Sequence, residues 1–394
     1  MTRESATLMV SHRVLEWARR TYGYTVSEAS KVSGINEASL SKWESEDSQI
    51  SLSAIRKLSK LYKRSFEVLL LPAPPQERAD PKYRISEQQP AEETRETKLI
   101  IREAKWIQDI AEELKEKAED KTKAKVQRYD SSSAAEKAAQ EERRKFGIEI
   151  STQMKWRDDK EALREWVKAV ESKGILIFQV SMPVGVRGFS IPEKDPPVIT
   201  LNTIDTPNSR IFTLFHEYAH ILLGESGICD PSNLHVLEST KRKSIENWCN
   251  DFAAAFMMPA NDVKSLATRI GTSQSSISKM CRDLKASTEA LLIRLYELNV
   301  IEYGFFKQEV ELAHKRSITY QKEQVEKRKR LREKMKKEGK ELKIDVVGRA
   351  RRIRGTNFIR LVLYNRSKGT ITTKDAMDYL SVGPENLDKL QTSV

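Results

Sequence analysis

Residues 211–224 read IFTLFHEYAHILLG, and their centre, HEYAH, places two of the chain's five histidines four residues apart around a glutamate. On an α-helix, residues i and i+4 lie on one face, so His216 and His220 can reach one ion. Neutral imidazole suits Zn²⁺, and catalytic zinc sites combine three protein ligands with a water. Glu217 stands where its carboxylate can take a proton from that water and pass it to a leaving amine. The stretch predicts a helix with two zinc ligands and a base, rather than two incidental histidines on an apolar helix.

A third ligand is needed, and several residues after this helix could supply it. Ser226 stands where a metzincin carries its third histidine, which excludes that class. The candidates are Glu225, Asp230, His235, Glu238 and Glu246. The first is too close along the same helix to turn back, and the next three are expected in a loop. We favour Glu246, because a ligand on a rigid helix packed against the first helix keeps its geometry. The alternative is a solvated glutamate that suits the dipole at a helix start.

The segments around the HEYAH helix predict a small sheet packed on helices, an α+β domain. GILIFQV (174–180) and PPVITLN (196–202) are β-like runs bounded by Gly, Pro and Asn, with GVRGFS between them. The HEYAH helix is expected to be capped near Ser209 and to stop at Gly224, and a second helix, KSIENWCNDFAAAFMMP, to end at Pro259. We also expect PPVITLN to offer an edge to which an extended substrate adds as a strand.

The run from GILIFQV through PPVITLN and RIFTLFHEYAHILLG to IENWCNDFAAAFMMP resembles the ImmA/IrrE family of metallo-endopeptidases, over about residues 145–300. Members share a strand ending in Leu-Asn, an FTxxHExxH helix, and an E-x-x-(A/C)-N-x-F-A motif that leads to Met-Pro. The resemblance implies a gluzincin-like zinc endopeptidase in which Glu246 is the third ligand and Asn250, one turn along, supports the ligands. Cys249 stands where many members carry Ala, and we expect a buried small residue there rather than a metal-binding thiolate.

Family members typically cleave a helix-turn-helix repressor and so release genes of stress responses or mobile elements. The resemblance therefore implies a regulatory protease whose partner is a protein substrate. Two other classes of function stay open. The first is a DNA-binding transcription regulator whose metal centre only senses or holds structure, and the second is a toxin–antitoxin fusion. Glu217 separates the protease from the regulator, since a structural zinc needs no base.

Residues 8–71 predict about five short helices, each opening near a Ser, Thr or Asn that can cap it. Within them, TVSEASKVSGINEASLSKWESE is similar to Cro- and repressor-type (Xre-like) helix-turn-helix domains, with Trp43-Glu44 matching that family's signature. The resemblance implies DNA binding through the second helix of the pair. The contact residues it implies are Asn36, Glu37, Ser39 and Lys42. Residues 1–70 carry a net charge of only +3, and the alternative is a bundle used for protein contact.

The order of these segments predicts five regions along the chain. They are a helix-turn-helix domain (1–72), a linker and helical connector (73–145), a zinc metallopeptidase core (146–261), a helix-turn-helix-like helical module (262–310), and a charged helix with a small C-terminal helical unit (311–394). The run 320–343 holds eleven Lys or Arg against five Glu. We expect it to be a solvated helix, although it could also clamp nucleic acid.

Composition favours a cytoplasmic protein without a membrane partner. No apolar run reaches the roughly 18 residues of a membrane span, and MTRESATLMVSHR lacks the layout of a secretory signal. Cys229, Cys249 and Cys281 form an odd, widely spaced set that suits reduced thiols.

Overall fold

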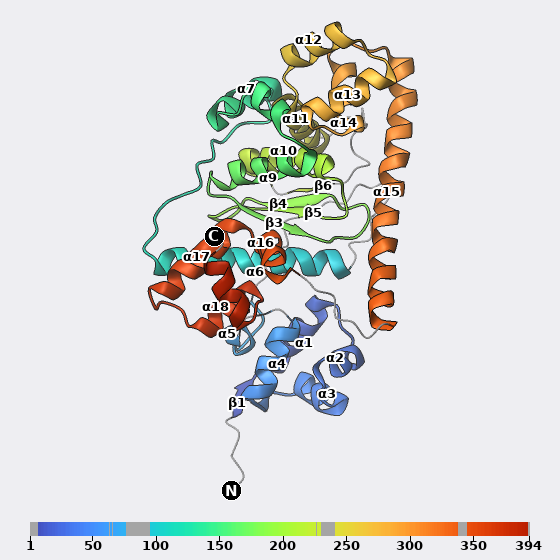
Figure 1. Ribbon diagram of the computed structural model, residues 1–394. Coiled ribbons are helices and arrows are strands. Elements are labelled where there is room, and N and C mark those ends of the chain that lie inside the picture. Colours follow the sequence, from blue (N-terminus) through green and yellow to red (C-terminus); the bar gives the residue numbers. More distant parts are fainter. Residues whose placement is uncertain are drawn as a thin grey trace. The chain divides into compact units, whose positions relative to one another are not determined.

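A computed structural model describes residues 7–62, 64, 66–75, 95–225, 227–229, 241–337 and 345–392 (Figure 1). The chain divides into two compact units, Met1–Ile107 and Gln108–Val394. The division falls within the long helix α6 (Arg95–Lys117). None of the described helices is both long and apolar enough to cross a membrane.

Five short helices and a two-stranded ribbon follow one another in the first unit. Their bounds are β1 (Thr7–Val10), α1 (His12–Tyr22), α2 (Val26–Ser33), α3 (Glu37–Ser45), β2 (Ser48–Ser51), α4 (Leu52–Tyr62) and α5 (Phe66–Leu69). Their apolar sides share one core, in which Val14, Leu40 and Ile55 are buried. The antiparallel β1–β2 ribbon was not predicted from the sequence. Its four-residue strands are too short to show an alternating pattern.

The helices α2 and α3 form the helix-turn-helix pair, and local capping sets their ends. Thr25 accepts a hydrogen bond from the backbone N–H of Glu28, whose carboxylate accepts one from the Thr25 N–H at 2.8 Å. Asn36 caps α3 by accepting from the N–H of Ala38 at 2.9 Å. These capping bonds fix where each helix starts.

Glu44, from the Trp43-Glu44 signature, holds α3 to α1. Its carboxylate accepts three bonds of 2.7–2.9 Å from the Arg19 guanidinium, and both side chains are nearly buried. Because removing one partner leaves a buried charge, Glu44→Ala should destabilise this unit by about 3 kcal/mol. Hydrogen exchange of α1–α4 in the full chain would measure the loss. The matched change Glu46→Ala, at an exposed pair with Lys42, should cost less than about 1 kcal/mol, and an equal loss in both variants would contradict the argument.

A four-stranded mixed sheet lies at the centre of the second unit. Its strands are β3 (Leu176–Val180), β4 (Gly188–Ile191), β5 (Val198–Asn202) and β6 (Gly227–Cys229), in the order β3-β5-β4-β6. β5 runs parallel to β3 and antiparallel to β4, and β6 pairs antiparallel with β4. The prediction that PPVITLN, which forms β5, offers a free edge is wrong. β5 pairs with β3 on one side and with β4, the short strand in GVRGFS, on the other.

Helices cover both faces of this sheet (Figure 1). On one face lie α9 (Asp159–Glu171) and α10 (Pro207–Leu223), with α7 (Ala135–Phe146) and α11 (Lys241–Met257) packed behind them. On the other face runs the second half of α6, where the Gln108 amide donates to the carbonyls of Ile191 and Pro196. The HEYAH helix is α10. Thr206 rather than Ser209 caps its start, and Gly224 ends it as expected.

The helical connector predicted within 73–145 contains two helices, α6 and α7, joined by an extended segment. The backbone N–H of Lys125 donates to Lys173 O at 2.7 Å, and that of Tyr129 donates to Leu222 O at 3.0 Å. Partners outside the segment thus replace the bonds that a helix would make.

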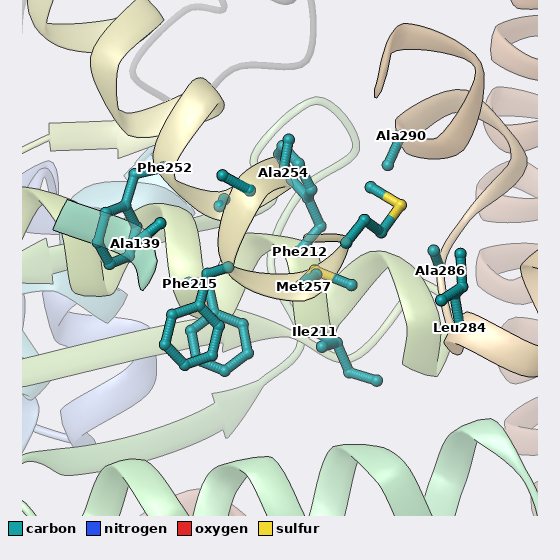
Figure 2. Close-up of a cluster of buried hydrophobic side chains, with 14 of the residues drawn as sticks. Ala139, Ile211, Phe212, Phe215, Phe252, Ala254, Met257, Leu284, Ala286 and Ala290 are labelled. Atoms are coloured by element: carbon teal, nitrogen blue, oxygen red, sulfur yellow. The ribbon is translucent and has the colours of Figure 1, made fainter. Parts of the chain in front are cut away.

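The remaining helices of the second unit are α8 (Ile150–Lys155), α12 (Ala260–Ile270), α13 (Gln274–Leu284), α14 (Thr288–Glu297), α15 (Tyr303–Lys337), α16 (Val346–Arg354), α17 (Thr356–Ser367), α18 (Thr373–Leu380) and α19 (Pro384–Gln391). The main core joins α10 and α11 to the helices around them, and Figure 2 shows part of it. There Phe215 of α10 stacks on Phe256 of α11 with ring centroids 4.1 Å apart. This packing fixes the register between the two helices.

Helices α16 and α17 pack against β3 at one side of the sheet, and α18 and α19 pack on these two helices. The backbone N–H of Thr356 donates to the Glu171 carboxylate at 2.7 Å, and the Asn357 amide donates to Glu171 O at 2.6 Å. A Cβ on Gly355 would lie 2.6 Å from Ile177 O, so only glycine allows this approach to the strand. The C-terminal helices therefore cover the outer edge of β3.

Candidate metal centre

Three side chains from α10 and α11 converge. The Nε2 atoms of His216 and His220 lie 3.2 Å apart. Glu246 Oε2 is 3.3 Å from His216 Nε2, and its Oε1 is 3.6 Å from His220 Nε2. In the described ranges, this is the group of His, Cys, Asp and Glu whose ligand atoms all lie within 4.8 Å of one another.

These separations fit one tetrahedral ion. Ligand atoms about 2.0–2.1 Å from a tetrahedral zinc are about 3.3–3.4 Å from each other, and the three distances here are 3.2, 3.3 and 3.6 Å. Two neutral imidazoles and a carboxylate are also a donor set that zinc accepts. The residues present therefore fit a divalent metal.

Glu217 lies next to this group and is fully buried. Its Oε2 accepts a hydrogen bond from Ser190 Oγ of β4 at 2.8 Å, and its Oε1 has no partner among the described residues. Burial raises the pKa of Glu217 to about 8, although His216 and Ser190 act to lower it. Burial also acts to raise the pKa of Glu246, but the two histidines outweigh it and hold that pKa below its usual range. Neighbouring carboxyls with such different pKa values are suited to different roles.

Strand β4 contributes two residues that the sequence reasoning missed, Gly188 and Ser190. They alternate with Phe189, so both face α10. A Cβ on Gly188 would lie 2.6 Å from Thr213 Cγ2 and 2.8 Å from Thr200 O, so the strand approaches the helix closely here. The sequence did contain a signal for these two residues. Small residues such as those of GVRGFS, between two predicted strands, indicate that another part of the chain approaches the strand backbone closely.

Gly188→Ala should destabilise the second unit by about 2–3 kcal/mol, because the added methyl meets a backbone oxygen that cannot move aside. Urea denaturation followed by circular dichroism would measure the loss. Gly304→Ala is the matched control, since a Cβ there has no atom within 4 Å, and it should change stability by less than about 1 kcal/mol. Equal stability of the two variants would refute the close approach.

Other residues proposed for the site take different places. Asn250 is half-buried one turn beyond Glu246, and the described structure shows no hydrogen bond from its side chain to the three ligands. Cys249 is buried, forms no disulfide and lies outside the ligand group. Glu225 is exposed beyond the end of α10. Asp230, His235 and Glu238 lie outside the described residues.

The predicted DNA contacts lie along α3. Asn36, Glu37 and Lys42 are exposed, whereas Ser39 is half-buried. The Asn36 side-chain oxygen is used for the helix cap, which leaves its amide to donate.

A buried helix with two histidines and an acid beneath a small sheet, facing a carboxylate from the next helix, is typical of metalloproteases. Residues 170–296 match the family model described as the IrrE N-terminal-like domain of peptidase M78, and residues 15–69 match the helix-turn-helix model. The chain is therefore similar to IrrE-like metalloproteases over residues 170–296 and to helix-turn-helix domains over residues 15–69.

Two curated relatives are similar to part of this chain, and each is named radiation response metalloprotease IrrE. The protein of Deinococcus deserti is 36% identical over 120 residues, which are 29% of this chain and 41% of the relative. The protein of Deinococcus radiodurans is 32% identical over 120 residues, which are 29% of this chain and 35% of the relative. The chain thus spans less than half the length of these relatives.

Proposed function

We propose that the chain is a zinc-dependent endopeptidase that cleaves a regulatory protein. The observation that carries this proposal is the convergence of His216, His220 and Glu246 beside the buried acid Glu217. A purely structural zinc site would be closed by a fourth protein ligand and would need no neighbouring acid. In the described part of the chain the group has three members, which suits a site that keeps one position for a reacting group.

In this proposal, a zinc ion held by the three side chains would supply Lewis-acid chemistry, polarising a peptide carbonyl and making water easier to deprotonate. Glu217 would accept the proton from the attacking water and deliver it to the leaving amine. Ser190 would hold the Glu217 carboxylate through its bond to Oε2, which leaves Oε1 to face the water.

We propose a helix-turn-helix repressor as the substrate and derepression of stress-response or mobile-element genes as the outcome. The IrrE-like domain supports a regulatory protease, and the helix-turn-helix domain supports a chain that works at DNA. Under this proposal Asn36, Glu37, Ser39 and Lys42 would contact the operator.

One observation favours a second candidate, a DNA-binding regulator with a structural or sensory metal. His216 and His220 are each 1% exposed and Glu217 is 0% exposed, so a polypeptide cannot reach them in this conformation. A sensory metal would need no such access. The two candidates differ in whether any peptide bond is cut.

The test is metal analysis combined with incubation of the chain with the product of a neighbouring repressor gene. The endopeptidase proposal expects about one zinc per chain and repressor fragments, and it expects cleavage to stop with a chelator and return with added zinc. Stoichiometric zinc with neither the repressor nor casein cleaved would favour the regulator instead. Mass spectrometry of the fragments would identify the bond.

A further inference from the structure

Most of the chain's net positive charge lies in one segment. Residues 320–360 hold sixteen Lys or Arg and six Asp or Glu, a net +10, whereas the whole chain has +12. Residues 1–70, which include the helix-turn-helix domain, have only +3. Salt-dependent attraction to phosphate follows such local charge. The helix-turn-helix domain is therefore not the chain's most favourable surface for a polyanion.

Within this segment, α15 presents several basic side chains to solvent, because its opposite side is held against the rest of the unit. Buried Gln321 donates to the Asp205 carboxylate, and Arg328 donates to Ser181 Oγ at 3.0 Å and to Thr203 O at 2.9 Å. Positions 321 and 328 lie seven residues apart, two turns along one face. The basic residues exposed elsewhere around this stretch of α15 are Lys322, Lys327, Lys329 and Arg330. Of these four, only Arg330 has an ion pair among the described residues, with Glu326 at 3.0 Å.

Beside this face, guanidinium groups from three elements gather near the carboxyl ends of the parallel strands β3 and β5. Arg210 of α10 donates to Gln179 at 2.8 Å, and its buried Nε has no partner among the described residues. Burial lowers the pKa of Arg210, Asp205 opposes this effect, and the charges of Arg328 and Arg352 lower it further. The carboxyl ends of parallel strands are where such sheets commonly bind ligands.

A cavity of about 250 Å³ opens at this place. Its lining residues are Ser181, Val325, Arg328, Lys329 and Glu333. The cavity is large enough to admit a phosphate group, and two of its five lining residues are cationic against one acid. The arginine cluster (Arg210, Arg328, Arg352) thus leaves positive charge next to a space that a phosphate could enter.

We propose that the exposed basic side chains of α15 and the arginine cluster form a surface, the basic face, that binds the phosphate backbone of double-stranded DNA without reading its sequence. The helix-turn-helix domain would supply the base contacts, and the basic face most of the salt-dependent affinity. Lys322 to Arg330 spans about 12 Å along α15, which suits a backbone better than one small phosphate. Duplex DNA is preferred to RNA because the chain's helix-turn-helix domain is of a kind that reads duplex DNA. The proposal does not depend on peptidase activity.

The test compares two triple variants of the full chain with the same change in net charge. The basic-face variant is Lys322→Gln, Lys327→Gln and Lys329→Gln, and the control is Lys137→Gln, Lys160→Gln and Lys264→Gln, at lysines that are exposed elsewhere on the second unit. Binding of a fluorescent duplex of random sequence is measured by anisotropy from about 50 to about 200 mM KCl. The slope of log K against log[KCl] should become shallower by about 2–3 in the basic-face variant, with affinity more than about tenfold weaker near 100 mM salt. The control should keep both values.

Three results would overturn the proposal. Equal losses in both triple variants would show an effect of net charge alone. Displacement of the duplex by inorganic pyrophosphate at matched ionic strength, with the slope unchanged in the basic-face variant, would show a small-phosphate site. A larger loss for single-stranded RNA than for duplex DNA would assign the face to RNA.

Lys42→Gln in α3 should change the slope by no more than about 1, which separates the basic face from the helix-turn-helix domain. Circular dichroism confirms that each variant is folded.

Discussion

Replacing Glu217 with Gln is expected to slow peptide-bond cleavage by a factor of about 10² to 10⁴ and to leave the metal in place. The amide keeps the size of the carboxyl and can still accept the hydrogen bond from Ser190, but it cannot take a proton from water. The ligand group does not include Glu217, so metal content should not change. Fragment yield from the substrate and metal per chain by plasma mass spectrometry are the two measurements.

Glu225→Gln is the matched control for this substitution. Glu225 is exposed just beyond the end of the same helix, so the variant loses the same charge without touching the site, and its cleavage rate should equal that of the unchanged chain. If Glu217→Gln still cleaved at the unchanged rate, Glu217 would not be the base. If it stopped cleavage only by losing metal, its role would be structural.

Glu246→Gln should weaken zinc binding by at least about 100-fold, a larger loss than supporting residues usually cause. The change removes the only negative ligand of the group and leaves two buried imidazoles facing a neutral amide. Competition with a chromophoric chelator would measure the affinity.

Asn247→Ala provides the comparison on the same helix, because Asn247 is exposed and should leave zinc affinity unchanged. Unaltered affinity in Glu246→Gln would remove Glu246 from the ligand set and return the search to Asp230, His235 and Glu238.

The sequence was most informative where spacing along one helix decides geometry. His216 and His220 had to share a face of α10, and the apolar residues around Glu246 indicated that its helix would pack there. Ser190 and Gly188 were missed because their contact with α10 crosses between a strand and a helix, which no local pattern records. Strands β4 and β6 have four and three residues, too few to show alternation. The prediction of a free edge at PPVITLN (196–202) was wrong for the same reason, since the short strand β4 that pairs with it was not recognised.

Helix α15 shows a different limit of sequence reasoning. Phe306, Val310 and Ala313 mark its buried side with apolar residues, but farther along that side the anchors are Gln321 and Arg328. Apolar residues no longer recur at helical spacing in the second half of α15, although the helix continues to Lys337. The sequence therefore predicted a separate charged helix after residue 310. Polar anchors to Asp205 and Thr203 replace apolar packing there.

Gly355, Thr356 and Asn357 hold the C-terminal helices against the outer edge of β3. This contact limits how short a fragment containing the metalloprotease-like region can be made. A fragment limited to residues 170–296 would lack these helices and expose the edge strand β3. Exposed edge strands tend to pair with other chains and aggregate. The stretch that matches the family model is thus shorter than the compact unit to which it belongs. A fragment made for expression should therefore extend through the last described helix, α19.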